Sequence, residues 1–198
     1  MNLVLSEVEL PVRLRLERPM TDEELMRFCA ANEALRVERD ANGELIVMTP
    51  AGFKTSKMNS RITRLLDAWA EADGRGVATD SNGGYTLPDG SVRAPDAAWV
   101  SLERLKDVSA EEQDRFAPVC PYFVIELVSP SNRLADVEAK MGMWIGNGAE
   151  VGWLIDPERK VVEIYRVGRA VEVLEGPETV EGDGPVAGFV LGMGRVWQ

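Results

Sequence analysis

The sequence predicts one domain of mixed α/β or α+β class. Three observations support this fold class. The 198 residues are enough for one large domain. Apolar runs typical of strands alternate with segments of helical periodicity, as in a sheet covered by helices. No repeat, low-complexity run or linker divides the chain, whose 45% hydrophobic and 28% charged residues are ordinary for a soluble globular protein.

The N-terminal part predicts a helix followed by a hairpin. We expect residues 1–20 to be a loosely structured lead-in and residues 21–198 to form the single domain. The domain opens on a helix, because Thr21 and Glu24 have the spacing of a capping box. The next segment, "ALRVERDANGELIVMTP", predicts two strands joined at Asn42-Gly43, which favours a hairpin turn.

The longest predicted helix follows this hairpin. It covers "KTSKMNSRITRLLDAWAEADG" and is expected to end at Gly74. Its apolar side chains recur at helical spacing: Met58, Ile62, Leu65, Leu66 and Trp69. Short strands are predicted next, around "GVATDS", "GGYTLPDGSVR" and "DAAWVS". Ser109 and Glu112 then form a second capping box.

The second half of the chain predicts a strand, a helix and three more strands. "PYFVIELV" reads as a strand buried on both faces, and "SNRLADVEAKMGMWIGNG" as a helix. The segments "EVGWLIDP", "VVEIYRV" and "AVEVLEG" are further strands. The apolar tail "GFVLGMGRVW" is expected to pack back on the domain as a strand or loop.

The absence of histidine narrows the possible chemistry. It excludes Ser-His and Cys-His catalysis, Cys/His zinc sites and histidine general bases. The two cysteines, Cys29 and Cys120, are expected to be buried thiols. Any catalysis must therefore use carboxylates, lysine, hydroxyls or a hard metal ion held by oxygens.

Charge and hydropathy limit the partners and the compartment. A net charge of −11 disfavours broad, nonspecific attraction to a polyanion and leaves only a local basic surface for one. No apolar run could span a bilayer, and the N-terminus does not resemble a signal peptide, so we expect a cytoplasmic protein without membrane contact. No Gly-rich turn precedes Lys-Ser or Lys-Thr, which excludes a P-loop.

Two carboxylates lie in unusually apolar surroundings. Glu126 sits inside the predicted strand Phe123–Val128, where an unpaired charge would cost several kcal/mol. Asp96 follows Pro95 at the start of another apolar strand. The two strands are close enough in the chain to be neighbours in the sheet. Two converging carboxylates need a cation, either a divalent ion or a lysine.

The next helix offers a lysine. Asp136 and Lys140 are four residues apart and share one helix face, from which Lys140 can reach Glu126. An Asp, a Glu, a Lys and a hard divalent ion are the parts needed to hydrolyse a phosphodiester, with the acids fixing the metal and the lysine orienting or activating water.

Other interpretations of these residues stay open. Asp96 could cap a turn, Asp136 and Lys140 could be a solvated helix pair, and Glu126 could form a plain salt bridge. A glycosidase with Asp96 and Glu126 as acid and base is disfavoured, because the five tryptophans form no evident sugar-stacking platform.

Three stretches carry a resemblance to a known family. They are "RAPDAAWV", "PYFVIELVSPSNRLADVEAKM" and "NGAEVGWLIDPERKVVEIYR". The chain resembles, from about Thr21 to its C-terminus, the Uma-type family of putative restriction endonucleases, a domain of unknown function in the PD-(D/E)XK nuclease superfamily. The resemblance implies a restriction-endonuclease-like core, a four-stranded mixed sheet flanked by helices, to which this chain adds an N-terminal hairpin and C-terminal strands. It also implies Mg²⁺-dependent (or Mn²⁺-dependent) phosphodiester hydrolysis.

The resemblance assigns roles to particular residues. Asp96 matches the acid of the Pro-Asp motif and Glu126 the second metal-binding acid. The usual motif lysine, two residues after the acid, is replaced by Val128, and Lys140 on the following helix takes its part. Many relatives carry a histidine about where this chain has Thr55, so that Thr55 would be an accessory residue here.

The predicted partner is nucleic acid, DNA before RNA. Lys54, Lys57, Arg61 and Arg64 place four cations along one face of the long helix. Ser129 is a further candidate for substrate binding. Glu44 and Asp136 are candidate accessory acids.

Two functional hypotheses follow. The first is a DNA endonuclease with Asp96, Glu126 and Lys140 as catalytic residues, acting as a homodimer that presents two sites to two strands. The second is a catalytically inactive nuclease fold that serves as a binding or regulatory module. The retained Asp-Glu-Lys set favours the enzyme.

Overall fold

The computed structural model describes residue 3 and residues 11–198. The chain forms two compact units, each assembled from separate segments. The first comprises the described residues of Met1–Ala51 with Gly84–Ala94 and Val108–Val119; the second comprises Gly52–Gly83, Pro95–Asp107 and Cys120–Gln198. The single domain over residues 21–198 stays a prediction. Within the described range, no helix has the length and apolar character needed to cross a membrane.

The first unit is built on an antiparallel five-stranded sheet in the order β1-β3-β2-β6-β5. Its strands are β1 (Val12–Leu14), β2 (Arg36–Arg39), β3 (Leu45–Met48), β5 (Tyr85–Thr86) and β6 (Val92–Arg93), and its helices are α1 (Asp22–Ala30) and α4 (Ala110–Gln113). The predicted hairpin is confirmed. Gly43 adopts φ 80° in its turn, and a Cβ there would overlap Pro19.

The predicted loose lead-in is wrong at Val12–Leu14, whereas the other described residues up to Met20 form no helix or strand. Val12–Leu14 forms β1, which pairs with the open edge of β3 in the register Val12↔Val47. Three residues carry too little periodicity to reveal a strand, and the pairing depends on an edge supplied from elsewhere in the chain. Residues 1–2 and 4–10 of the predicted lead-in lie outside the described residues.

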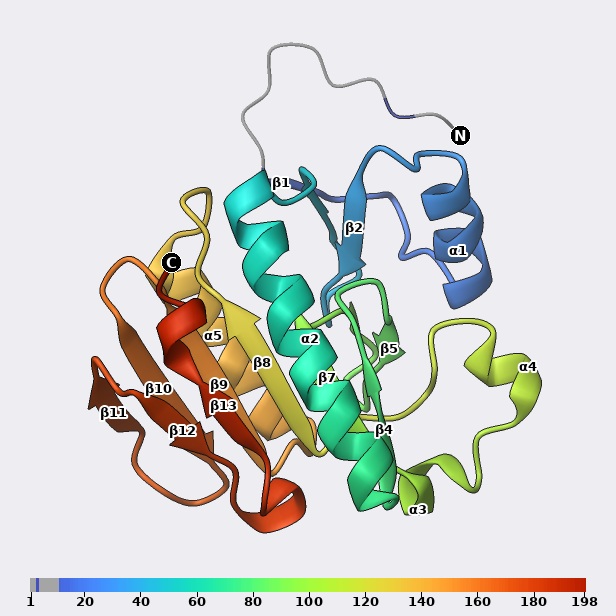
Figure 1. The fold of residues 1–198 in the computed structure, drawn as a ribbon. Coiled ribbons are helices and arrows are strands. Elements are labelled where there is room, and N and C mark those ends of the chain that lie inside the picture. Colours follow the sequence, from blue (N-terminus) through green and yellow to red (C-terminus); the bar gives the residue numbers. More distant parts are fainter. Residues whose placement is uncertain (1–2, 4–10) are drawn as a thin grey trace. The chain divides into compact units, whose positions relative to one another are not determined.

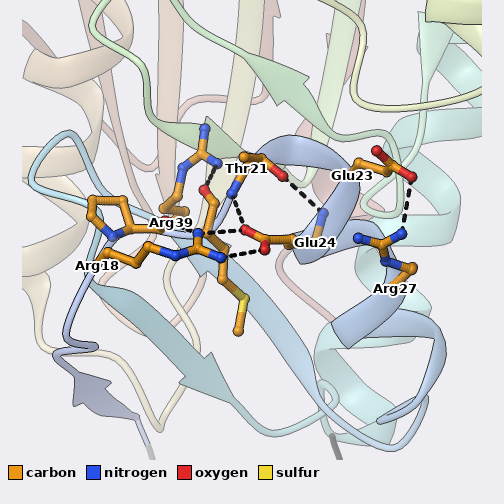
Figure 2. A network of polar contacts seen from close by, with 8 residues as sticks. Arg18, Thr21, Glu23, Glu24, Arg27 and Arg39 are labelled. Atoms are coloured by element: carbon orange, nitrogen blue, oxygen red, sulfur yellow. Dashed lines mark hydrogen bonds and ion pairs between the residues drawn. The ribbon is translucent and has the colours of Figure 1, made fainter.

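The predicted capping box of α1 is confirmed and extended by an arginine (Figure 2). The Glu24 amide donates to Thr21 Oγ1 at 3.2 Å, and the Thr21 amide donates to Glu24 Oε2 at 2.9 Å. Arg18 adds two donors to the same carboxylate, at 2.8 and 2.6 Å. Arg39 donates to the Met20 carbonyl and to Asp22. The start of α1 is thus held by charge-assisted hydrogen bonds.

The second unit is built on a six-stranded mixed sheet in the order β11-β10-β9-β8-β7-β4. Its strands are β4 (Gly76–Thr79), β7 (Ala97–Ser101), β8 (Phe123–Leu127), β9 (Val151–Asp156), β10 (Val161–Arg166) and β11 (Glu172–Glu175). Only the β8–β9 pair is parallel, because the helix α5 (Leu134–Gly146) returns the chain to the start of the next strand. This is the predicted mixed sheet flanked by helices.

Helices cover both faces of this sheet (Figure 1). The helix α2 (Phe53–Asp73), ended by Gly74 at φ 72°, packs with the C-terminal segment against the face that carries Phe123, Ile125 and Leu127. The C-terminal segment holds β12 (Thr179–Glu181), the 3₁₀ helices η1 (Gly184–Val186) and η2 (Met193–Arg195), and β13 (Val190–Gly192). Elsewhere in this unit, a short helix, α3 (Leu102–Leu105), directly follows β7.

The opposite face carries Val124 and Glu126 and is covered by α5. A Cβ on Gly152 of β9 would collide with the Cε atom of Met141, so the glycine lets α5 approach the sheet closely. The C-terminal tail packs back as predicted, since Phe189 stacks on Trp153 with ring centroids 5.5 Å apart. Glu126 therefore points from the middle of the sheet toward α5.

Candidate active site

Glu126 is held by two side chains of α5. The glutamate is only 5% exposed. Lys140 Nζ lies 2.9 Å from its Oε1 atom, and Trp144 Nε1 donates to the same oxygen at 2.8 Å. A buried carboxylate is tolerated only when its charge is paired and hydrogen-bonded, and α5 supplies both conditions.

The geometry of α5 explains why these two residues act together. Lys140 and Trp144 are four residues apart and therefore lie on the same side of the helix. Trp144 belongs to the buried stripe, whereas the side chain of Lys140 is 20% exposed at its border. Trp144 is not among the site residues that the sequence predicted. The signal that it missed is the indole N–H, which needs an acceptor when it is buried.

Asp96 lies beside Glu126 across the β7–β8 pair. The two strands are antiparallel neighbours, as predicted, with Ala97 opposite Ile125. Asp96 directly precedes Ala97, so it lies at the start of β7 next to the part of β8 that holds Glu126 and Leu127. The Leu127 amide donates to Asp96 Oδ2 at 2.8 Å, which ties the aspartate to the neighbouring strand.

A further acid, the buried Glu163, lies in the same row of the sheet. Leu154 of β9 pairs with Glu126 on one side and with Glu163 of β10 on the other. Tyr165 donates its hydroxyl to Glu163 at 2.8 Å. Burial, and next the hydrogen bond to Glu163, raise the pKa of Tyr165 well above its usual range, which keeps the hydroxyl protonated. The sequence predicted neither residue for the site.

The donor set fits a hard divalent cation. Asp96 and Glu126 supply carboxylate oxygens, which Mg²⁺ and Mn²⁺ prefer, and Mg²⁺ is commonly held by one or two carboxylates with water and phosphate completing its shell. Among the described residues no group of three or more His, Cys, Asp or Glu side chains could hold a metal, so a protein cage as used for Ca²⁺ is absent from that part of the chain.

Ser129 and Asp136 lie in the turn and first helical turn after β8. The Ser129 hydroxyl lies 2.6 Å from Asn132 Oδ1 and 2.9 Å from the Ser131 hydroxyl. Asp136 is exposed, and its carboxylate lies 3.9 Å from Arg133 Nε. Both stay candidates for the roles that the sequence suggested.

The four cations of α2 divide into two kinds. Lys54 and Arg64 are exposed to solvent. Lys57 and Arg61 instead donate to the carbonyls of Gln198 and Arg195, at 3.4 and 2.7 Å. Thr55 is buried in the first turn of α2.

Two acids of the first unit bear on the prediction of the site. Glu44 lies just before β3, not on the strand as expected, and pairs with Arg15. Glu38, which the sequence did not single out, forms a buried ion pair with Arg93 at 2.9 Å and accepts from the Ala94 amide at 3.3 Å.

The comparisons with known proteins agree with this fold. A crystal structure described as a putative nuclease belonging to DUF820, from Anabaena variabilis, has a TM-score of 0.73 and 20% identity, with 90% of this chain and 98% of that chain covered. The cryo-EM structure of a DrdV–DNA complex has a TM-score of 0.39 and 16% identity over 61% of this chain and 10% of that chain, which does not establish a shared fold. No curated protein matches the chain.

A family model adds the identity. The model of Uma2, described as "Putative restriction endonuclease", matches residues 22–194. That range contains Asp96, Glu126 and Lys140, and it confirms the resemblance drawn from the sequence. The chain therefore belongs to the Uma2 family of putative restriction endonucleases.

Proposed function

We propose that this protein is an endonuclease that hydrolyses phosphodiester bonds in DNA with the help of Mg²⁺ or Mn²⁺. One observation carries the proposal: Lys140 Nζ lies 2.9 Å from Oε1 of the buried Glu126, beside the position of Asp96. Two acids and a lysine that lie close together are the groups that metal-assisted phosphodiester hydrolysis needs. Membership of the Uma2 family supports the same reaction class.

Each residue has a distinct part. Asp96 and Glu126 would hold the ion, which when bound polarises the phosphate and activates water. Lys140, paired with Glu126 as an ammonium, supplies positive charge beside the scissile phosphate, where negative charge accumulates during the reaction. Trp144 fixes the orientation of the Glu126 carboxylate, and the Leu127 amide that of Asp96. Trp144 and Leu127 are positioning residues, because neither reaches the reacting atoms.

The substrate would meet the basic side of α2. Lys54 and Arg64 extend into solvent, where they can contact backbone phosphates. Ser129 would add a contact next to β8, and Thr55, Asp136 and Glu44 stay accessory candidates. We place the protein in the cytoplasm as a homodimer, in which two copies would address the two strands of a duplex.

One observation favours a second function, that of an inactive nuclease fold used for binding or regulation. Lys140 and Trp144 already satisfy Oε1 of Glu126, which is also how a purely structural ion pair would look. Val128 occupies the position of the usual motif lysine. Both functions predict DNA binding, and only the first predicts strand cleavage.

Plasmid cleavage separates the two functions. Supercoiled plasmid would be incubated with Mg²⁺ or Mn²⁺ and with the wild type, Lys140→Gln, Glu126→Gln, or Lys106→Gln, which changes an exposed lysine of the same unit. If the protein is an endonuclease, the wild type and Lys106→Gln should produce nicked and linear DNA, and the other two variants should lose this cleavage. Plasmid that stays supercoiled with all four folded proteins would establish the inactive fold.

A further inference from the structure

A depression between α2 and the C-terminal segment gathers three arginines. It has a volume of about 790 Å³, and its walls include Arg61 and Arg64 of α2, Arg195 of η2, and the apolar Leu65 and Val190. We propose that this depression binds the phosphate of a nucleic-acid backbone and anchors the substrate away from the carboxylates. The inference rests on the proposed function only in taking the phosphate to belong to DNA.

The charge of the depression points to an anion. No acidic side chain lines it, and in the described part of the chain no carboxylate pairs with any of its three arginines. Arginines elsewhere commonly have an acidic partner, as Arg75, Arg115 and Arg166 do. Gln198 also lines the depression, and no acidic side chain there offsets the three guanidinium charges, which favours an anionic ligand such as phosphate.

The fold holds the Arg61 side chain and the backbone segment that carries Arg195. Arg61 donates one N–H to the carbonyl of Arg195 at 2.7 Å, which ties α2 to η2. Met193 and Val196, on either side of Arg195, are buried in the core and anchor that segment. A guanidinium has five N–H donors, so Arg61 keeps further donors for a ligand after making this bond. The backbone that carries Arg61 and Arg195 is therefore set before a ligand binds, while the exposed side chains of Arg64 and Arg195 can adjust to it.

The shape of the depression favours a polymer over a small phosphate. Gly192 and Gly194 line it, and neither would meet another atom within 4 Å if it carried a Cβ, so this side is open. The cations also continue beyond the depression along the same helix, through Lys57 and Lys54 toward its N-terminus. A backbone with several phosphates can use this series, whereas a free phosphate can occupy only the depression.

The location assigns the depression to binding rather than to chemistry. α2 covers the face of the sheet that carries Ile125, whereas Glu126 faces α5 on the other side (Figure 1). A phosphate held by Arg64 and Arg195 is therefore not the one that reacts. Loss of these arginines should raise KM for DNA and leave kcat little changed.

The test measures binding of a short labelled DNA duplex by fluorescence anisotropy at several salt concentrations, with EDTA present so that no cleavage occurs. The variants are Arg64→Gln and Arg195→Gln; the second keeps the backbone carbonyl that accepts from Arg61. The control, Arg159→Gln, removes one charge from an exposed arginine in the turn between β9 and β10 of the same unit. Each test variant should bind several-fold more weakly and lower the salt slope by about 0.9, while the control should not.

Competition distinguishes the source of the phosphate. Inorganic phosphate and a nucleoside monophosphate are titrated against the duplex and the wild type. Weak competition by both small anions supports a backbone site. The proposal is overturned if either small anion binds tightly and if Arg195→Gln abolishes that binding but leaves the affinity for the duplex unchanged. Equal duplex affinity of both test variants and the control also overturns the proposal. Because metal is absent, neither result depends on the chemistry at Glu126.

Discussion

Oε1 of Glu126 accepts from two donors on α5, Lys140 and Trp144. The donors differ in what they can contribute. Lys140 neutralises the carboxylate and lies at the border of solvent, where it can also meet a substrate. Trp144 is buried and neutral, so its bond orients the carboxylate without changing the charge of the site. The two contributions can therefore be separated by substitution.

Trp144→Phe removes the indole N–H and keeps an aromatic ring in the core. Because a hydrogen bond to a charged group is lost from a buried site, we expect the free energy of unfolding to fall by about 1 to 3 kcal/mol. Cleavage by the folded variant should also fall, since Glu126 loses one of the bonds that fix its orientation. Urea unfolding and plasmid cleavage give the two readouts. Tyr122→Phe, an aromatic change elsewhere in the same unit, is the control. An unchanged cleavage rate in Trp144→Phe would mean that Trp144 does not position Glu126 for the reaction.

Lys140→Met leaves the carboxylate of Glu126 buried without its cation. We expect this variant to lose more than about 1 kcal/mol of stability, because an uncompensated buried charge is costly. Adding Glu126→Gln should restore part of the loss, since the double variant has no buried charge. A double-mutant cycle from urea unfolding measures the coupling. Additive losses would mean that the 2.9 Å ion pair contributes no coupling in solution.

At the scale of elements, the capping boxes, the Asn42-Gly43 hairpin and the ends of α2 follow from the sequence. These features are local, because each depends on residues within a few positions of one another. β1 and the partners of Trp144 could not be predicted in this way. Both depend on groups that lie far along the chain, namely the edge of β3 and the carboxylate of Glu126.

The start of α1 predicts a dependence on pH. The hydrogen bonds from Arg18, and next the amide of Thr21, lower the pKa of Glu24 from its ordinary 4.5 to about 2 (Figure 2). A carboxyl group with a lowered pKa stabilises the folded state above its unfolded pKa, and this contribution is lost as pH falls through the folded pKa. Between pH 4.5 and about 2, wild-type stability should therefore fall more steeply than that of Glu24→Gln.

Urea unfolding at several pH values measures this effect. Glu23→Gln is the matched control, because it removes the same charge from the same turn and leaves Thr21 and Arg18 in place. If the difference in free energy of unfolding between the wild type and Glu24→Gln stays constant across the acid range, the capping network does not contribute to stability in solution.

At the scale of the whole molecule, the charged side chains are unevenly distributed. The chain has a net charge of −11, yet three arginines gather around one depression and an ion pair is buried beneath α5. The order of the elements and the class of fold could be predicted from periodicity. The two compact units could not, because Gly84–Ala94 and Val108–Val119 join the N-terminal sheet through contacts distant in sequence.

Candidate acids could be found from the sequence because Glu126 violates the apolar pattern of its strand. Lys140 could be found because its helix follows that strand directly and places the lysine on the side that faces the sheet. Glu163 and Tyr165 were missed, since only the register of three strands brings them into the row of Glu126. The sequence therefore reveals a charged residue within an apolar strand, whereas the sheet register is needed to identify the neighbours of that residue.

The most direct measurement is calorimetric titration of Mn²⁺ and Mg²⁺ into the wild type and Glu126→Gln, with plasmid cleavage recorded on the same samples. We expect the wild type to bind the ion and to cut DNA, and Glu126→Gln to lose both while it stays folded. If the wild type binds no ion at millimolar concentration, and Glu126→Gln changes only stability, then Lys140 and Trp144 hold Glu126 for structure alone and the protein is not a metal-dependent nuclease.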